Sequence, residues 1–270
     1  MISDITIGQY YKENSVVHRL DARNKVVLTA LLMAMIFCCK NFLSLLLVAA
    51  VIFISMLLSK VPLKMYFKSL KSIVPIILFT SVLNLFYVKG GREWSFWILS
   101  VSEKGIYTAI FMAIRITLLI VASSILTYTT VPTMLTDAIE KLLSPLKVFH
   151  ISVHSLAMMM TLALRFIPTL IEEIERITNA QKARGADFEN GKLTERVKAL
   201  IPVLVPLFVS SFKRAYDLAF AMSCRCYTGG EGRTRMKQMK LGVKDFAAVG
   251  FYVAGFAGII LLNKYFGALI

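Results

Sequence analysis

Seven apolar runs dominate this sequence and constrain its fold more than any other feature. A helix needs ~20 predominantly apolar residues to cross the hydrocarbon core of a bilayer, and ~17 is a practical minimum. The second, fourth and last runs reach that length alone, and the first and third reach it only with their flanking residues. We therefore predict an all-α integral membrane protein with about five to six membrane helices. The runs lie at about 26–39, 41–59, 73–88, 105–131, 151–171, 199–212 and 244–263.

The first two runs are separated only by Lys40 and Asn41. This spacing predicts an antiparallel helix pair with a short turn, although a re-entrant pair that does not cross fully fits the same pattern. Between the third and fourth runs, a glycine turn is followed by Trp94 and Trp97. Tryptophan favours membrane interfaces, so we predict an interfacial loop there.

The charge balance fits a membrane better than a nucleic acid. The chain is 57% hydrophobic and 17% charged, and its 31 Lys and Arg outnumber its 16 Asp and Glu. No aromatic-interleaved basic patch or nucleic-acid motif is present. Basic residues instead collect in alternate segments between the apolar runs, as the positive-inside rule describes. We expect a multi-pass protein of the cell membrane with its N-terminus and residues 132–243 in the cytoplasm.

Motifs for catalysis or metal binding are weak. The four cysteines form no C-x-x-C pair, so we expect them to be unpaired and to hold no metal. His150 and His154 have helical spacing but lack the H-E-x-x-H context of a zinc site. The sequence at 229–233 lacks the lysine of a phosphate loop, so no ATP hydrolysis and no cofactor are expected. Glu172, Glu173 and Glu175 are interpreted as a solvated helix face. Residues 1–25 contain no apolar core of a signal peptide.

Residues 132–230 form an unusual segment because they are both apolar and periodic. A first helix is predicted from Pro132 to about Leu143, before Pro145. A second carries apolar residues at helical spacing from Phe166 to Ile177. A third is expected from about Val203 to Arg225. These three amphipathic helices have polar faces that are costly in hydrocarbon, so we expect them to lie along the interface or to pack on one another.

Arg115 lies in the middle of the apolar run 105–131. A charge at that depth usually faces protein or water. Contact with another subunit, or a gate, is one interpretation. The other is that carbonyl groups of a neighbouring helix satisfy the guanidinium, or that the side chain snorkels along a tilted helix.

Two arginines close two of the amphipathic helices and resemble each other in their surroundings. Arg184 stands between Ala183 and Gly185, and Arg225 between Cys224 and Cys226. A cation near a helix C-terminus stabilises the unpaired carbonyls, and Gly185 suits a left-handed cap, so capping explains each arginine singly. Small neighbours would also let each tip approach a partner closely. Two such tips fit a partner that is itself a dimer with two grooves.

Several stretches together resemble the transmembrane T component of energy-coupling factor transporters, a family of vitamin and metal-ion importers. The order and spacing of these stretches are specific, and they extend over most of the chain. They are 18–25 (HRLDARNK), 145–147 (PLK), 163–168 (ALRFIP) with Glu172 and Glu173, 180–187 (AQKARGAD), and 221–222 (AM) before 225–227 (RCY).

The resemblance implies a scaffold that works with two cytoplasmic ABC-type ATPases and a small substrate-binding membrane protein, the S component. In that family, the arginine at each coupling-helix tip inserts into a groove of one ATPase. Carried over, these arginines are Arg184 and Arg225. Arg115 and Arg165 are further candidate subunit contacts. The implied organisation is a transmembrane region at 1–131, a cytoplasmic coupling-helix region at 132–235 and a C-terminal transmembrane helix at 236–270.

Two other functions compete with this one. A self-sufficient secondary transporter or channel would need ionisable groups at the membrane midplane and usually an internal repeat. Only Arg115 lies deep, and no repeat is visible. A membrane-anchored scaffold without a transport role would differ from the coupling subunit only in its partners.

Overall fold

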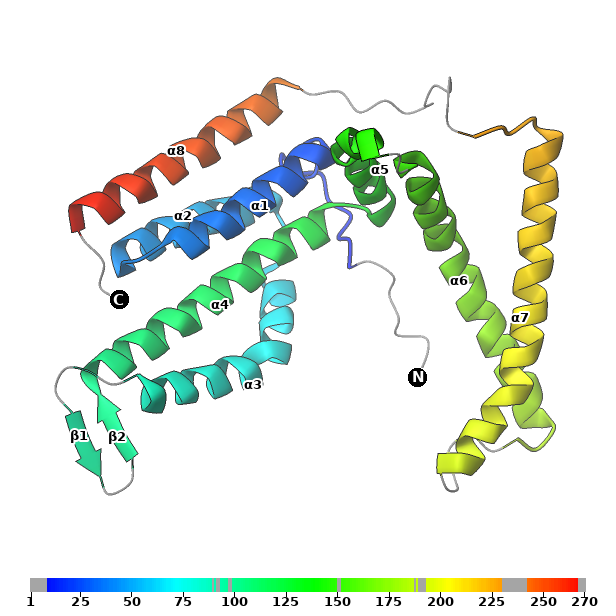
Figure 1. Ribbon diagram of the computed structural model, residues 1–270, viewed down its shortest axis with the longest axis horizontal. Coiled ribbons are helices and arrows are strands. Elements are labelled where there is room, and N and C mark those ends of the chain that lie inside the picture. The colour runs from blue at the N-terminus through cyan, green and yellow to red at the C-terminus, as the bar shows by residue number, and fades with distance from the viewer. Residues whose placement is uncertain are drawn as a thin grey trace. The chain divides into compact units, whose positions relative to one another are not determined.

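The computed structural model describes residues 9–88, 90, 93–96, 99–149, 152–186, 188, 193–229 and 242–266. In that part of the chain, helices account for nearly all regular structure (Figure 1). The chain divides into two compact units. The larger unit comprises Gly8–Ala138 and Gln238–Ile270, and the smaller unit comprises Met1–Ile7 and Ile139–Lys237.

Long apolar helices build the larger unit. They are α1 (Ala22–Cys38), α2 (Phe42–Ser59), α3 (Leu63–Tyr87), α4 (Glu103–Thr129) and α8 (Val243–Phe266). In the described part of the chain, α2, α3, α4, α6, α7 and α8 are long and apolar enough to cross a membrane. The predicted all-α membrane fold is therefore confirmed. Helix α1 has 17 residues, the practical minimum for a span.

A short hairpin occupies part of the segment that we expected to be a loop. Strands β1 (Glu93–Phe96) and β2 (Leu99–Ser102) pair antiparallel, with Trp94 opposite Val101. Trp97 lies outside the described residues. The hairpin leads directly into α4, whose N-cap Ser102 accepts a hydrogen bond from the Gly105 N–H at 3.0 Å. A side-chain oxygen at this position satisfies one of the free N–H groups at a helix start.

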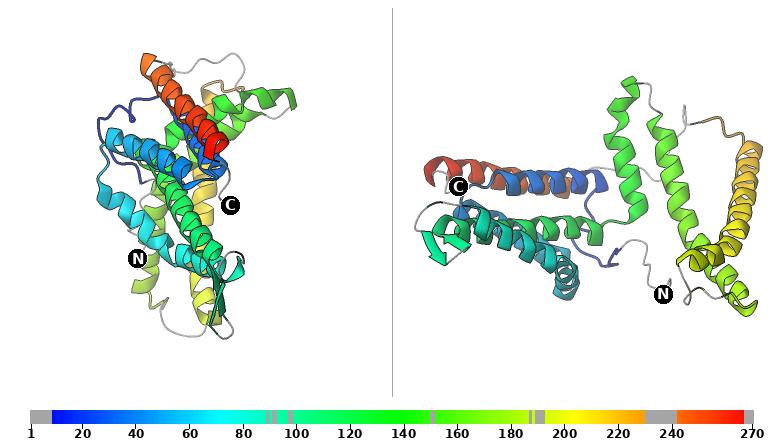
Figure 2. Two further views of the ribbon diagram at one scale, coloured as in Figure 1. Left: turned by 90° about the vertical axis from the view of Figure 1, so that its left-hand side faces the viewer. Right: turned by 60° about the horizontal axis from the view of Figure 1, so that its bottom comes forward.

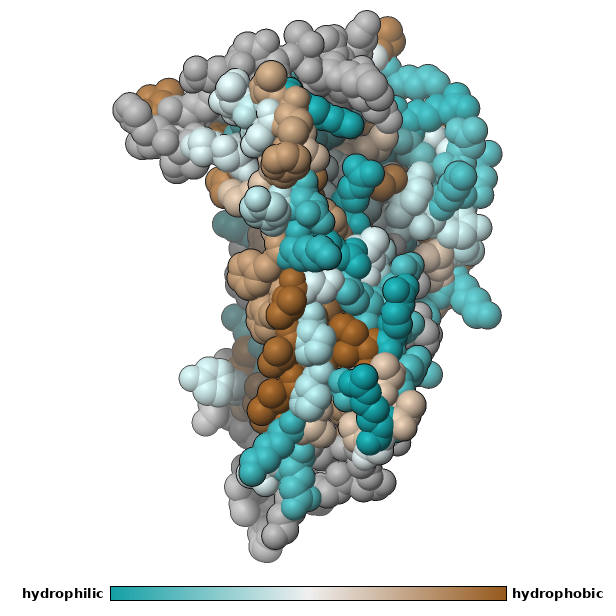
Figure 3. Space-filling view, turned by 90° about the vertical axis from the view of Figure 1, so that its right-hand side faces the viewer, coloured by the Kyte–Doolittle hydropathy of each residue, from teal (hydrophilic) through white to brown (hydrophobic). Residues whose placement is uncertain are grey.

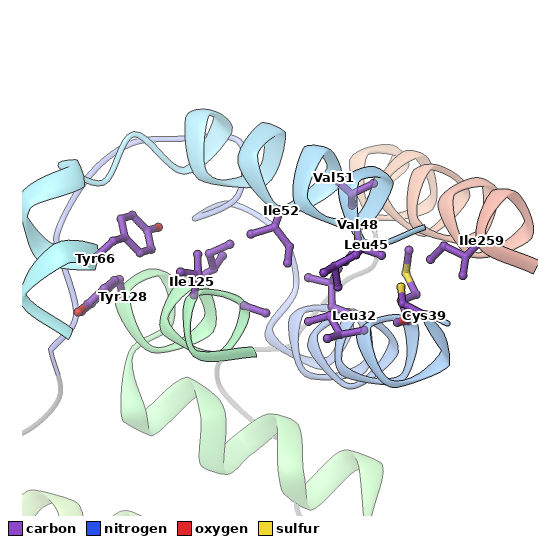
Figure 4. Packing of buried hydrophobic residues seen from close by; sticks show 14 of the residues in the cluster. Leu32, Cys39, Leu45, Val48, Val51, Ile52, Tyr66, Ile125, Tyr128 and Ile259 are labelled. Atoms are coloured by element: carbon purple, nitrogen blue, oxygen red, sulfur yellow. Dashed lines mark hydrogen bonds between the residues drawn. The ribbon is translucent and has the colours of Figure 1, made fainter. Parts of the chain in front are cut away.

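The core of the larger unit lies where α1, α2, α4 and α8 meet. Figure 4 shows Leu32 of α1, Val48 of α2 and Ile259 of α8 converging there, with Ile125 of α4 nearby. Val48 and Ile259 are fully buried. A Cβ added at Gly255 would lie 3.2 Å from Met35 Cε. The glycine therefore lets α8 approach α1 closely, as small residues do between membrane helices.

The smaller unit contains two of the longest helices in the described chain. Helices α6 (Val153–Ala183) and α7 (Leu193–Cys224) follow the short helix η1 (Ser144–Phe149). Helix α5 (Pro132–Leu142) spans the boundary between the units, and its bounds confirm the sequence prediction. Figure 2 shows α6 and α7 crossing near the end of α6. The two amphipathic helices pack on each other, which is one of the arrangements we expected.

The start of α7 differs from the prediction. We expected this helix from about Val203. Pro202 and Pro206 stand near that point, and proline usually interrupts helices. The helix begins ten residues earlier, at Leu193, and continues through both prolines. Proline removes one internal hydrogen bond from a helix, and a packed neighbour can supply a substitute donor. Such a donor is present on α6.

Candidate functional site

The two arginines singled out in the sequence stand at equivalent positions in the structure. Helix α6 ends at Ala183 and helix α7 at Cys224, so Arg184 and Arg225 are the first residues beyond the two helices. Both side chains are exposed. Neither makes a hydrogen bond or ion pair with any other residue that the structure describes. Each guanidinium is therefore available to a partner.

The backbone closes both helices with the same pair of hydrogen bonds. After α6, the Gly185 N–H donates to Lys182 O and the Ala186 N–H to Gln181 O, both at 3.0 Å. After α7, the Cys226 N–H donates to Ser223 O at 2.9 Å and the Tyr227 N–H to Met222 O at 3.0 Å. This is the Schellman arrangement, in which crossed bonds satisfy the last free carbonyls. The two ends are thus structurally alike despite different sequences.

The residue after each arginine adopts a left-handed conformation. Gly185 has a φ of +89°, which confirms the predicted cap. Cys226 has a φ of +54°, although it carries a Cβ. A left-handed backbone costs an L-residue ~1–2 kcal/mol, whereas glycine adopts it freely. The α7 end therefore holds a strained residue in the shape that the α6 end reaches without strain.

Side-chain contacts show that α6 and α7 run antiparallel. Near the α6 end, Gln181 Nε2 lies 3.4 Å from Pro202 O, and in the middle Glu173 contacts Arg214. At the other end, the Tyr227 hydroxyl lies 2.8 Å from Met158 Sδ. The two arginine tips consequently lie at opposite ends of the pair (Figure 1). Helix α7 has 32 residues, which corresponds to a rod of ~48 Å.

The Gln181 contact supplies a donor for the carbonyl that Pro206 leaves without its backbone partner. Pro206 has no N–H, so the carbonyl of Pro202 lacks its usual partner four residues on. Gln181 of α6 donates to that carbonyl. Gln181 is only three residues before Arg184. Its hydrogen bond therefore links the α6 tip to the early part of α7.

Glu173 corrects the prediction of a solvated acidic face. Its side chain is 17% exposed, and Oε2 lies 2.5 Å from Nη2 of Arg214. Oε1 accepts a hydrogen bond from the Ser210 hydroxyl. Helical spacing placed Glu173 on the polar face of α6, but it does not reveal that α7 packs over part of that face. The charged network joins the two helices midway between the tips.

Arg115 binds backbone rather than an acidic side chain. Its Nη2 lies 2.6 Å from the carbonyl oxygen of Cys39, just beyond α1, and its Cζ lies 4.6 Å from the centroid of the Phe111 ring. This arrangement agrees with the interpretation in which a neighbouring helix satisfies the charge. Nε is buried without a partner in the described part of the chain. Arg165 is exposed on α6, without a described partner.

The residues that the structure describes contain no group of three or more His, Cys, Asp or Glu side chains that could hold a metal ion. His154 Nδ1 lies 3.1 Å from Oε1 of Glu140. His150 lies outside the described residues, as does Asp187 at the end of the 180–187 stretch.

Lys25, in the 18–25 stretch, anchors a buried site that periodicity did not reveal. It is 6% exposed, and its Nζ donates to His18 O at 3.1 Å and to Thr129 O at 2.8 Å. The Thr129 carbonyl is the last of α4, where a cation complements the helix dipole. Burial lowers the pKa of His18, a shift opposed by its hydrogen bond to the Tyr11 carbonyl. Lys25 thus holds the beginning of α1 to the end of α4.

Asp21 and Asp245 complete this buried charge cluster. The Asp21 N–H donates to Oδ1 of Asp245 at 2.9 Å, and the Gly242 N–H donates to Oδ2 at 2.7 Å. Asp21 also caps α1 by accepting from the Arg23 N–H at 2.9 Å. Asp21 and Asp245 are 224 residues apart in sequence. We call Asp21, Lys25 and Asp245 the Lys25 cluster.

Comparison with known proteins places the chain in a family. Residues 13–236 match the family model CbiQ, described as cobalt transport protein. The chain belongs to the CbiQ family. The energy-coupling factor transporter transmembrane protein EcfT of Ruminiclostridium cellulolyticum is 49% identical, over 98% of this chain and 100% of that protein. The EcfT proteins of Clostridium kluyveri and Lactobacillus helveticus are 48% and 37% identical, over 92% and 98% of this chain and 93% and 95% of theirs.

These similarities confirm the resemblance found in the sequence. This CbiQ-family chain is a multi-pass membrane protein and a transmembrane component of an energy-coupling factor transporter. The names of its relatives imply a complex with other subunits.

Proposed function

We propose that this chain is the scaffold that transmits ATP-driven movement from two cytoplasmic ABC-type ATPases to a small substrate-binding membrane protein, for uptake of a vitamin or metal ion. The observation that carries the proposal is the pair of equivalent arginine tips on α6 and α7. Both arginines are exposed, and both follow a helix closed by the same hydrogen bonds. Two like tips match the two like subunits of an ATPase dimer. The chain itself hydrolyses no ATP in this scheme.

The geometry of the tips suits transmission. Arg184 and Arg225 project from opposite ends of one antiparallel pair, and the contacts at Glu173 and Gln181 tie the two helices together. A guanidinium offers a planar fork of donors to carboxylates or carbonyls in a groove. Movement of the two ATPases relative to each other would therefore act on both ends of the pair at once.

An apolar band on α7 supports a membrane-embedded partner. Figure 3 shows apolar side chains gathered along the side of the smaller unit on which α7 lies. Four aromatic residues at every fourth position of α7 are each more than 60% exposed. Exposed apolar surface of this extent marks a site for protein or lipid contact. We assign this band to the substrate-binding subunit. The residues are Phe208, Phe212, Tyr216 and Phe220.

Orientation follows from charge. With the N-terminus and residues 132–243 in the cytoplasm, most Lys and Arg lie on the cytoplasmic side, as the positive-inside rule favours. The arginine tips then face the compartment that contains the ATPases. We keep the three-part organisation 1–131, 132–235 and 236–270 as part of the proposal. Arg165, which is exposed on α6, is assigned as a secondary subunit contact, whereas Arg115 is already bound by the Cys39 carbonyl.

The test is the double substitution Arg184→Ala with Arg225→Ala in the full chain, co-expressed with its ATPase and substrate-binding partners. We expect membrane insertion to persist and co-purification of the ATPases to be lost. A matched control replaces Lys213 by alanine, because Lys213 is exposed on α7 between the two tips. Normal assembly and uptake by the double arginine variant would refute the proposal. Uptake by the chain alone in liposomes would instead identify a self-sufficient transporter.

A further inference from the structure

A cavity of about 320 Å³ lies in the larger unit among α1, α2, α4, α8 and the segment that precedes α1. Its walls are mainly aliphatic and aromatic. They include Val17, Leu28, Leu58, Ile125, Leu126 and Phe251. A volume of this size is enough for part of an organic ligand.

The cavity has a buried floor and an exposed rim. Leu32 and Ala122 on the floor are 2% and 0% exposed. Val16 and Leu58 on the rim are both 48% exposed, and Lys244 on the rim is also exposed. A ligand can therefore enter from outside the helix bundle and extend between the helices.

The deep part of the cavity requires no polar occupant. The Ser55 and Tyr252 hydroxyl groups, which line it, are hydrogen-bonded to each other at 2.8 Å. The Thr29 hydroxyl donates to Lys25 O at 2.8 Å. An apolar space whose hydroxyl groups are already hydrogen-bonded favours hydrocarbon over water, because water in a cavity needs several polar partners.

Two lysines, Lys25 and Lys244, line the other end of the cavity, with the carboxylates of Asp21 and Asp245 near them. Lys244 makes no ion pair or hydrogen bond with another residue in the described part of the chain. Lys25 also lines the cavity and has three N–H donors, of which two bind the carbonyls of His18 and Thr129. Its remaining donor is available to an acceptor in the cavity. Asp245, beside Lys244, directs both carboxylate oxygens to backbone N–H groups.

The length of the cavity matches lipid dimensions. Its lining extends from Lys25 to Leu32 on α1 and from Lys244 to Tyr252 on α8, or roughly 10–12 Å along each helix. One leaflet contributes ~15 Å to the hydrocarbon core. The end lined by the two lysines coincides with the helix ends, and the apolar end lies farther along the helices.

We propose that this cavity holds an acyl chain of one anionic phospholipid, with its phosphate at Lys244 and Lys25. Lys244, which has no ion pair in the described part of the chain, suits an anionic headgroup, and the apolar floor suits the acyl chain. Basic pockets between membrane helices commonly receive anionic lipid headgroups in this way. The site shares no residues with the arginine tips, so its test is independent of the proposed coupling function.

The first experiment is native mass spectrometry of the full chain from micelles containing equal amounts of phosphatidylglycerol and phosphatidylcholine. We expect one phosphatidylglycerol molecule to be retained, with about a five-fold preference over phosphatidylcholine. This is the preference that one lysine near an anionic headgroup provides, at about 1 kcal/mol. Lys244→Glu should abolish that preference, while Lys264→Glu near the other end of α8 should leave it intact. Equal retention of the two lipids by the unmodified chain would overturn the headgroup assignment.

A second variant tests the acyl site. Ala248→Phe fills the cavity from α8, whereas Ala254→Phe places the same bulk on an exposed part of α8 outside the cavity. We expect at least a ten-fold loss of bound lipid for the first and none for the second. Unchanged lipid retention by a folded Ala248→Phe chain would contradict the proposal.

A photolabelling measurement needs no substitution. Phosphatidylglycerol with a diazirine in one acyl chain would be reconstituted with the full chain, illuminated and mapped by peptide mass spectrometry. Labels should concentrate on the cavity-lining parts of α1, α4 and α8. Labels distributed evenly over the outer faces of α3 and α8 would refute the proposal even if the cavity-filling variant failed to fold.

Discussion

The ends of α6 and α7 reach one geometry by different means. At the α6 end, glycine at position 185 adopts the left-handed conformation without a Cβ, and an added Cβ would meet no atom within 4 Å. At the α7 end, Cys226 adopts it at a cost. Both ends nevertheless present an exposed arginine one residue earlier. The comparison teaches that the shape of the tip, rather than the Ala-Arg-Gly sequence, is the common feature.

The largest expected effect tests whether the two tips are equivalent in use. Arg184→Ala and Arg225→Ala, made singly, should each weaken ATPase binding by about 2–5 kcal/mol, because a groove that binds the guanidinium would be left unpaired. Lysine should rescue neither, since it lacks the planar fork. Affinity measured by titration of the full chain with the ATPase dimer tests this. A large loss at only one tip would show that the two ends are not equivalent.

A second prediction concerns the ion pair between Glu173 and Arg214, which holds α6 and α7 together between the two tips. Arg214→Met should destabilise the α6–α7 pair by about 1–2 kcal/mol, because it leaves the largely buried Glu173 carboxylate without its cationic partner. Adding Glu173→Gln should recover part of that loss. Unfolding in detergent, followed by circular dichroism, provides the measurement. Lys213→Met is the matched control, since Lys213 is exposed on the same helix.

A third prediction separates the two caps. Gly185→Ala should destabilise the α6 end by ~1 kcal/mol, because alanine is strained at this φ although space is open. Cys226→Ala should have little effect on the α7 end, where a Cβ is already accommodated. Hydrogen exchange of the last-turn amides measures both, and a ~1 kcal/mol change corresponds to about five-fold faster exchange. Equal responses would mean that the caps are not distinguished by strain.

The smallest expected effect is a gain in the stability of the α7 end. Cys226→Gly should relieve the strain and stabilise the α7 end by ~0.5 kcal/mol, after the entropy cost of glycine in the unfolded chain is subtracted. The same hydrogen-exchange experiment should show slower exchange at Tyr227. Transport should be unchanged if the shape of the tip is what matters. Faster exchange would indicate that the cysteine side chain itself stabilises the end.

Local signals predicted much of this molecule. Apolar runs predicted the membrane helices, Pro132 and Pro145 bounded α5, and Gly185 predicted the left-handed cap. These features depend on residues within one or two helical turns, so the sequence contains them directly. The arginine positions at the helix ends belong to the same class.

Other features depend on tertiary contacts and could not be found in this way. Helix α7 continues through Pro206, where Gln181 of α6 donates to the Pro202 carbonyl. The burial of Glu173 requires α7 to lie over it. The bond between Asp21 and Asp245 joins residues at the two ends of the chain. Periodicity records which face of a helix is apolar, but it does not record which helix covers that face.

The Lys25 cluster has a mechanical consequence. Helix α4 precedes the crossing of the chain into the smaller unit at 138–139, and α8 follows the return at 237–238. The last carbonyl of α4 binds Lys25, and the first turn of α8 binds Asp21, so both helices are yoked to the same turn of α1. A force on the segment after α4 or on the segment before α8 is therefore shared between these two helices through α1. The two connections to the smaller unit thus transmit force to one buried cluster in the larger unit, and not to two independent helix ends.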